Sequence, residues 1–216
     1  MSFRIDKDSL GEFKVPDNAY YGPFTARAIE QYKVTGNKSH LNLIKAYVMI
    51  KRSAALTNFE LQILDEKIAK VIIQACDEIL SGQFLDHFVV DAINSGAGTA
   101  VNMNINEIIA NRALEILGKS KGEYSIISPN DHVNMSQSSN DTFPTAMHIA
   151  ILMNTNLLLR SLDLMIASLK DKSLHFKNII KIGRTHLMDA LPVTLGSEFE
   201  VYAYALERAK EEIINS

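Results

Sequence analysis

Four side chains that could bind an anion or move a proton lie within six residues of one another late in the sequence: Arg184, Thr185, His186 and Asp189. Imidazole titrates near neutral pH, so His186 could serve as an acid or a base. A single histidine in a loop is more often structural or solvated than catalytic, however. The segment 183–190 therefore indicates acid–base chemistry as a hypothesis and nothing narrower.

A run of small hydrogen-bonding residues, 128–141, directly precedes a long apolar helical pattern. Most of its side chains donate or accept hydrogen bonds without carrying charge. Backbone N–H groups at the start of a helix are unpaired and favour an anion, so such a run suits a carboxylate or phosphate group. The alternative is a solvated loop in which Asn140 or Asp141 simply caps the helix.

A third polar segment contains Gly96, Gly98 and Thr99, and it precedes another helical pattern. Glycines allow a backbone to approach a ligand closely. Thr99 would then present its hydroxyl next to the outward-pointing N–H groups of the helix. From spacing alone, a plain glycine turn with Thr99 as a cap explains the same residues.

The rest of the sequence is strongly helical. Asp65 is well placed to cap one helix, and Gly82 follows its end, where a left-handed residue belongs. The first 36 residues, 118–139 and 181–195 have no helical period, because glycine, proline and polar residues interrupt it. Apolar residues recur at helical spacing over 41–61, 65–80, 103–117, about 141–176 and 196–214.

We therefore predict a mainly α fold, with an irregular N-terminal segment followed by long helices. An N-terminal domain would cover 1–139, and 140–216 would be the first part of a central helical bundle. The long helix is apolar on more than one face. Two long helices cannot bury so broad a surface alone, so the bundle is expected to be completed by further helices or by other subunits. The sequence also ends within a helical pattern, which favours a fragment.

Composition restricts the class of protein. The 216 residues are 47% hydrophobic and carry a net charge of −3, and no basic block favours nucleic acid or an anionic membrane. Cys76 is the single cysteine, so neither an intrachain disulfide nor a thiolate metal cluster is expected. No metal-ligand spacing, P-loop or dinucleotide fingerprint is present, so no metal or cofactor is predicted. With no signal-peptide pattern and no run of 18 apolar residues, a cytoplasmic protein fits best.

Taken together, the three polar segments resemble the fumarase/aspartase superfamily, which contains aspartate ammonia-lyases and class II fumarate hydratases. Residues 8–28 also fit the family's opening segment. The resemblance covers essentially the whole chain. It rests on Gly96-Ala97-Gly98-Thr99 with Asn102-Met103-Asn104 and Asn106-Glu107, on Pro129-Asn130-Asp131-His132-Val133-Asn134 with Ser136-Gln137-Ser138-Ser139-Asn140-Asp141, and on Gly183-Arg184-Thr185-His186-Leu187 with Asp189-Ala190.

The resemblance implies a mainly α-helical homotetramer whose active sites are each built from three chains, with a small dicarboxylate as substrate. It also implies an anti-elimination that yields fumarate. The family's S-S-x-M-P-x-K-x-N loop, which carries the serine thought to be the general base, does not occur in these 216 residues. The 216 residues alone are therefore expected to be inactive.

The resemblance also assigns roles to residues. By similarity, Thr99, Ser138, Ser139 and Asn140 would bind the two carboxylates of the substrate. Thr185 would contribute to the same site from another subunit, with His186 beside it as a catalytic group. A secondary anion site would involve Ser128, Asn130 and Asp131.

The choice between the two activities rests on single positions. The resemblance favours an aspartate ammonia-lyase at the motif Gly96-Ala97-Gly98-Thr99, over the stretch 127–137 with Met135, and at the Tyr20-Tyr21 pair. The Ser138-Ser139-Asn140 triplet favours a class II fumarate hydratase. Met188 stands where glutamine is usual, and Ser197 where glutamine usually precedes Glu198. A lyase acting on L-aspartate is the first expectation, a fumarate hydratase the alternative, and a non-catalytic helical scaffold a further one.

Overall fold

A computed structural model describes residues 2–216. Contacts divide the chain into two compact units, the residues up to Ile151 and Leu152–Ser216. The predicted domain boundary between residues 139 and 140 follows the start of the long helix and stays a prediction. The mainly α fold is confirmed, since helices account for most of the described residues and the strands among them form two small two-stranded sheets.

The N-terminal segment is more regular than predicted. Strands β1 (Phe3–Asp8) and β2 (Gly11–Pro16) form an antiparallel hairpin, and helix α1 (Pro23–Gln31) follows. Arg4 ties the hairpin to the chain beyond it. Its guanidinium group donates hydrogen bonds to the carbonyl oxygens of Pro16, Asp17, Ala19 and Tyr21.

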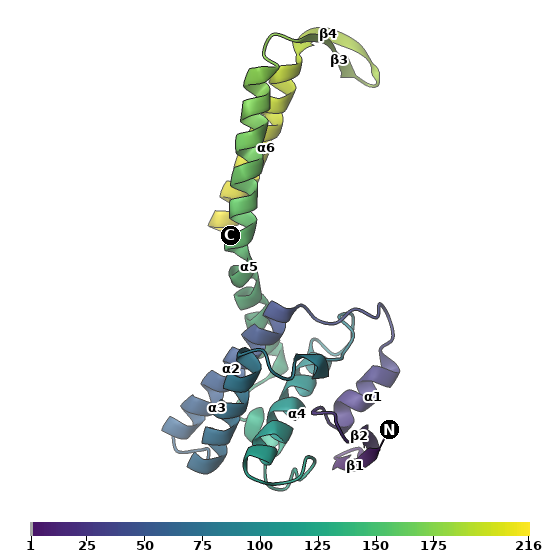
Figure 1. The fold of residues 1–216 in the computed structure, drawn as a ribbon, viewed down its shortest axis with the longest axis vertical. Coiled ribbons are helices and arrows are strands. Elements are labelled where there is room, and N and C mark those ends of the chain that lie inside the picture. The colour runs from purple at the N-terminus through teal and green to yellow at the C-terminus, as the bar shows by residue number, and fades with distance from the viewer. Residues whose placement is uncertain (1) are drawn as a thin grey trace. The chain divides into compact units, whose positions relative to one another are not determined.

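Three helices form the body of the first unit: α2 (Leu41–Glu60), α3 (Glu66–Leu80) and α4 (Thr99–Ile116), which lie side by side (Figure 1). Asp65 caps α3 as predicted, since its carboxylate accepts the N–H groups of Lys67 and Ile68. A short 3-10 turn (η1, Leu85–His87) and a five-residue π-helical turn (η2, Pro129–Val133) complete the unit. Helix α4 begins at Thr99, four residues before the predicted start at residue 103.

Helix α4 is buried on nearly every side and therefore occupies the centre of the unit. Its apolar residues Ile105, Ile108, Ile109 and Leu114 are fully buried. A row of polar side chains is buried along with them, and this was not predicted. These side chains are Asn102, Asn104, Asn106, Glu107 and Asn111.

The second unit contains most of the long helix α5 (Ser139–His175, 37 residues) and helix α6 (Leu195–Asn215). Two ion pairs join these helices, Lys170–Glu207 and Lys210–Asp163, each with nitrogen and oxygen 2.5 Å apart. The segment predicted as a loop, 181–195, is largely a hairpin. Strand β3 (Ile180–Thr185) pairs antiparallel with β4 (Met188–Thr194) across a two-residue turn, with a register shift between Ile182 and Arg184.

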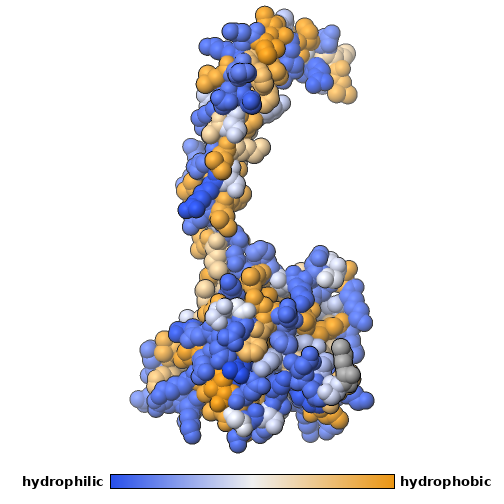
Figure 2. All heavy atoms as spheres, in the orientation of Figure 1, coloured by the Kyte–Doolittle hydropathy of each residue, from blue (hydrophilic) through white to orange (hydrophobic). Residues whose placement is uncertain are grey.

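Many apolar side chains of α5 and α6 lie on the surface of the single chain (Figure 2). By length and composition alone, α5 could cross a membrane, although the core helix of a soluble protein meets the same criterion. Only 11% of its most apolar window is buried within the chain. We therefore keep the prediction that other helices cover this surface in a shared bundle.

Candidate functional site

The turn before α4 is built by three consecutive left-handed residues. Gly96 and Gly98 both have φ of 85°, and Ala97 between them has φ of 49°. The turn returns the chain on itself, so that the N–H and the hydroxyl of Thr99 both donate to the carbonyl oxygen of Gly96, at 2.9 and 2.6 Å. Thr99 is thereby fixed as the first residue of α4, where unpaired N–H groups face outward.

Position 98 requires a glycine for two reasons, its left-handed backbone conformation and the close approach of the Phe143 side chain. A Cβ atom there would lie 2.2 Å from Cγ of Phe143, which belongs to α5. The turn before α4 and the N-terminal part of α5 are thus in direct contact. This contact sets how closely the starts of the two helices approach each other.

We expect Gly98→Ala to lower the free energy of unfolding by roughly 2–5 kcal/mol, from left-handed strain and from overpacking against Phe143. The matched control is Gly118→Ala. Gly118 also has positive φ but open space around its Cα, so its cost should be only about 1–2 kcal/mol. Urea unfolding of both variants of the complete protein measures the difference. Equal midpoints would show that the Phe143 contact is not restrictive.

The second element of the site is the start of α5. The hydroxyl oxygen of Ser138 accepts the N–H of Asn140 at 3.3 Å, and its carbonyl oxygen accepts the N–H of Thr142 at 2.9 Å. Ser138 therefore occupies the capping position that was predicted for Asn140 or Asp141. The prediction was wrong because a serine hydroxyl two residues before an N–H is an equally good cap, and sequence alone does not rank them.

The two helix starts meet at a pair of hydroxyl groups. Oγ1 of Thr99 lies 3.3 Å from Oγ of Ser139, although the residues are 40 positions apart in the sequence. Both are partly buried, whereas Ser138 and Asn140 on either side of Ser139 are exposed. The structure thus brings Thr99 together with the segment Ser138, Ser139 and Asn140. Two N-termini and several neutral donors converge there, which favours an anion.

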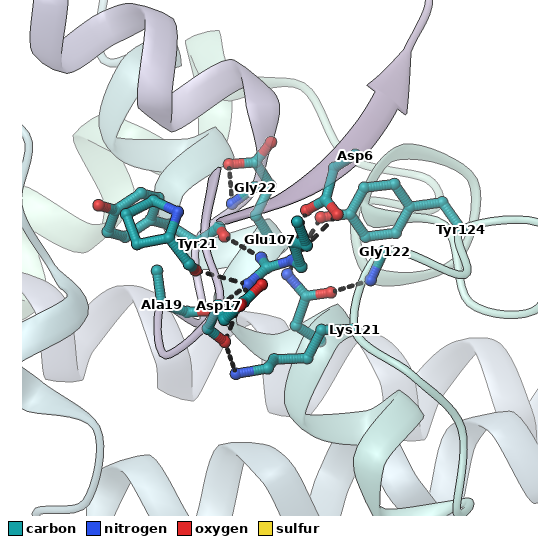
Figure 3. Close-up of polar contacts among 12 residues, drawn as sticks. Asp6, Asp17, Ala19, Tyr21, Gly22, Glu107, Lys121, Gly122 and Tyr124 are labelled. Atoms are coloured by element: carbon teal, nitrogen blue, oxygen red, sulfur yellow. Dashed lines mark hydrogen bonds and ion pairs between the residues drawn. The ribbon is translucent and has the colours of Figure 1, made fainter. Parts of the chain in front are cut away.

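Glu107 anchors α1 against α4 near this point. Its carboxylate accepts the N–H group of Gly22 at 2.9 Å (Figure 3). It also accepts the N–H groups of Phe24 at 2.9 Å and of Thr25 at 3.0 Å. Burial raises the pKa of Glu107, and the N–H donors act in the opposite direction. A side chain from the middle of α4 therefore satisfies the unpaired donors at the start of α1.

Asp91 fixes the chain just before the Gly96 turn. Its carboxylate accepts the N–H groups of Ile93, Thr35 and Gly36 within 2.9 Å. These donors, with Ile93 the strongest, hold the pKa of Asp91 well below its usual range. The ionised carboxylate therefore joins two loops of the first unit at neutral pH.

Next to Thr99 lies a cavity of about 600 Å³. Thr99, Met103 and Glu107 line one part of it. Ser128, Asn130 and Asp131, the predicted secondary anion site, line another part. Ser128 caps the short turn η2, since its hydroxyl accepts the N–H of Asp131 at 3.0 Å. An anion-binding role for these three residues stays a prediction.

Thr185 and His186 belong to the second unit, at the tip of the β3–β4 hairpin. His186 and Leu187 form the two-residue turn, with φ of 48° and 62°. Such a turn normally takes asparagine or glycine, so both residues are held in a conformation that their side chains disfavour. Leu187 is 96% exposed. The predicted catalytic role of His186 is not tested by this geometry.

Sequence reasoning missed Glu107 as an anchor and the buried amides of α4 as a group. The signal was present, because asparagine is unusual at 102, 104, 106 and 111 in an otherwise apolar helix. A polar residue on a buried helix must find a hydrogen-bond partner. The partners come from other segments and are invisible in the local pattern.

Comparison with known proteins identifies the family of the chain. A family model described as lyase matches residues 11–216. An aspartate ammonia-lyase from Bacillus sp. is 51% identical over 99% of this chain and 46% of its own length. A class II fumarate hydratase from Helicobacter pylori (strain ATCC 700392 / 26695) is 50% identical over 100% of this chain and 47% of its own.

Among solved structures, the fumarate lyase:delta crystallin from Brucella melitensis in native form superposes with a TM-score of 0.87. It is 45% identical, over 98% of this chain and 50% of that one. The chain therefore belongs to the lyase family that includes the aspartate ammonia-lyases and class II fumarate hydratases. It spans about half the length of the relatives that it matches.

Proposed function

We propose that this chain supplies the dicarboxylate-binding part of a lyase that eliminates ammonia from L-aspartate to give fumarate. The observation that carries the proposal is the convergence of the α4 and α5 N-termini, with Thr99 and Ser139 hydroxyl oxygens 3.3 Å apart. What this site offers is a set of neutral donors for the oxygens of carboxylates.

The reaction explains why neutral donors suit it. A base removes a proton from the carbon next to one carboxylate, and the electron pair is delocalised onto the oxygens of that carboxylate. The carbon–nitrogen bond then breaks, ammonia leaves with the bonding pair after receiving a proton, and a carbon–carbon double bond forms. The barrier comes from the extra negative charge on the carboxylate. Donors fixed in advance around those oxygens lower it electrostatically.

In the proposed site, Thr99, Ser138, Ser139 and Asn140 bind the substrate's carboxylates. Thr185 and His186 complete it from another copy of the chain within a homotetramer, with His186 stabilising charge or assisting the leaving group. The strained turn at the exposed hairpin tip supports a functional role for His186, because such strain is retained where structure alone does not require it. No general base is assigned among these residues.

The alternative is a class II fumarate hydratase, which interconverts L-malate and fumarate. Both substrates present two carboxylates, and only the leaving group differs. Relatives of the two kinds are 51% and 50% identical to this chain, so identity does not separate them. The preference for L-aspartate rests on the resemblance at Ala97, Met135 and the Tyr20-Tyr21 pair.

The test uses the complete enzyme, meaning this chain together with whatever follows it in its reading frame. Fumarate formation is followed by its ultraviolet absorbance with L-aspartate and, separately, with L-malate. We expect turnover of L-aspartate. Turnover of L-malate alone would establish the hydratase instead, and turnover of neither by a folded protein would favour the non-catalytic scaffold.

A further inference from the structure

A lysine lies at the centre of the first unit. Lys51, on α2, has no exposed surface. Its Nζ donates a hydrogen bond to Oδ1 of Asn134 at 2.8 Å and lies 5.2 Å from the centre of the Tyr47 ring. Burial lowers the pKa of Lys51 to about 7. A lysine in such a place is costly, since removing an ammonium from water is unfavourable unless it is well paired.

The acceptor of that bond belongs to the turn that leads into α5. Oδ1 of Asn134 also accepts hydrogen bonds from the amides of Asn102 and Asn106 on α4, at 3.1 and 3.2 Å. Nδ2 of Asn134 donates to the carbonyl oxygen of Gln137 at 3.1 Å, the residue directly before Ser138. One amide group therefore connects α2, α4 and the end of the turn.

The turn needs this support. Ser136 has φ of 62°, a left-handed conformation that serine disfavours. The turn is also held from α2, where the amide of Asn58 donates to the carbonyl oxygen of Met135 at 3.1 Å. Contacts from two helices thus fix a strained turn, and the chain continues from it directly into Ser138, Ser139 and Asn140.

The buried polar cluster around Lys51 and Asn134 contains more hydrogen-bonding groups than its own contacts use. Among the described residues, three buried amide oxygens around it have no hydrogen-bond partner: Asn102 Oδ1, Asn106 Oδ1 and Gln137 Oε1. The amine of Lys51 carries at least two N–H donors, and the bond to Asn134 uses one of them. A cluster that served only stability would be replaced at little cost by apolar residues of similar volume. A buried amine bound to an amide oxygen, directly behind a segment proposed to bind an anion, points to a role in that binding.

We propose that Lys51 is a positioning residue of the dicarboxylate site: acting through Asn134, it sets the turn 134–137 and thereby the aim of Ser138, Ser139 and Asn140. This inference rests on the proposed function, since it assigns the α5 N-terminus to a dicarboxylate. Lys51 itself touches no substrate. Its loss misplaces donors whose value depends on their being fixed in advance.

The experiment measures the affinity of the complete enzyme for succinate, a four-carbon dicarboxylate that cannot undergo the elimination, by titration calorimetry. Lys51→Met keeps the length and the apolar stem but removes the donor and the charge. We expect it to weaken succinate binding at least about tenfold, a shift of roughly 1.4 kcal/mol. The matched control is Lys67→Met, an exposed lysine on α3, which should leave the affinity unchanged.

A double-mutant cycle separates positioning from general stability. Asn134→Leu removes the partner of Lys51, so adding Lys51→Met to it should weaken binding by less than about twofold further. If Lys51→Met does not fold, Asn134→Leu alone carries the test. Additive effects, or unchanged succinate affinity in folded variants whose thermal midpoints have fallen, would make Lys51 only structural. Absence of succinate binding by the unaltered enzyme would instead overturn the proposed function itself.

Discussion

Replacing Asn140 by alanine in the complete enzyme is expected to lower kcat on the order of 100-fold or more, as removal of one donor to a developing oxyanion does. Asn140 is exposed at the first turn of α5, one residue beyond the Ser139 hydroxyl that lies 3.3 Å from Thr99. Its amide is not consumed in capping, because Ser138 fills that role. The same loss is expected for His186→Ala at the hairpin tip.

Initial rates of fumarate formation over a range of substrate concentrations give both constants. A fall in kcat with little change in KM indicates that the interaction is made mainly in the transition state. The controls are Asn37→Ala and His175→Ala, two exposed residues of the same types outside the proposed site. Rates for Asn140→Ala and His186→Ala equal to those of the controls would refute the assignment of the site.

Replacing Glu107 by alanine should lower the free energy of unfolding by roughly 3–5 kcal/mol, because it leaves three N–H groups of the α1 start without an acceptor. These are the N–H groups of Gly22, Phe24 and Thr25. The shape of the cavity next to Thr99 should change as well, since Phe24 is one of its lining residues.

The measurement is the urea concentration at half-unfolding, compared at one protein concentration. The control is Glu66→Ala, an exposed glutamate that pairs with Lys70 on α3 and should change stability by less than about 1 kcal/mol. Glu107→Gln adds a second comparison. A glutamine keeps the shape but offers one oxygen for three donors. The midpoint of Glu107→Gln should therefore lie between those of Glu107→Ala and Glu66→Ala. Equal midpoints for Glu107→Ala and Glu66→Ala would contradict the anchoring role.

The helices that sequence predicts well are those whose signals are local. For α3, apolar spacing and the Asp65 cap determine the element within its own residues. The two hairpins were missed because their turns lack the usual asparagine–glycine pair, and the β3–β4 turn is made by His186 and Leu187. The start of α4 was placed late because Thr99, Val101 and Asn102 are poor helix formers that tertiary contacts nonetheless stabilise.

The candidate site could be predicted as a set of residues but not as a geometry. Thr99 and Ser139 were selected from polar segments and a resemblance, while their contact depends on the packing of Gly98 against Phe143. Lys51 gave no sign in the sequence, because a lysine within a helix usually points to solvent. Only packing against α4 and the 134–137 turn shows that it is buried.

The contacts of Arg4 can form early during synthesis of the chain. The four carbonyl oxygens that its guanidinium group binds all lie between Pro16 and Tyr21. Arg4 and all of its acceptors have therefore been synthesised once Tyr21 has been added, well before the residues of α4. Short-range contacts close quickly, because little chain entropy is lost in forming a small loop. The N-terminal hairpin can thus form before α4 does. The N–H group of Gly22, which follows the hairpin, then donates to Glu107 once α4 has folded.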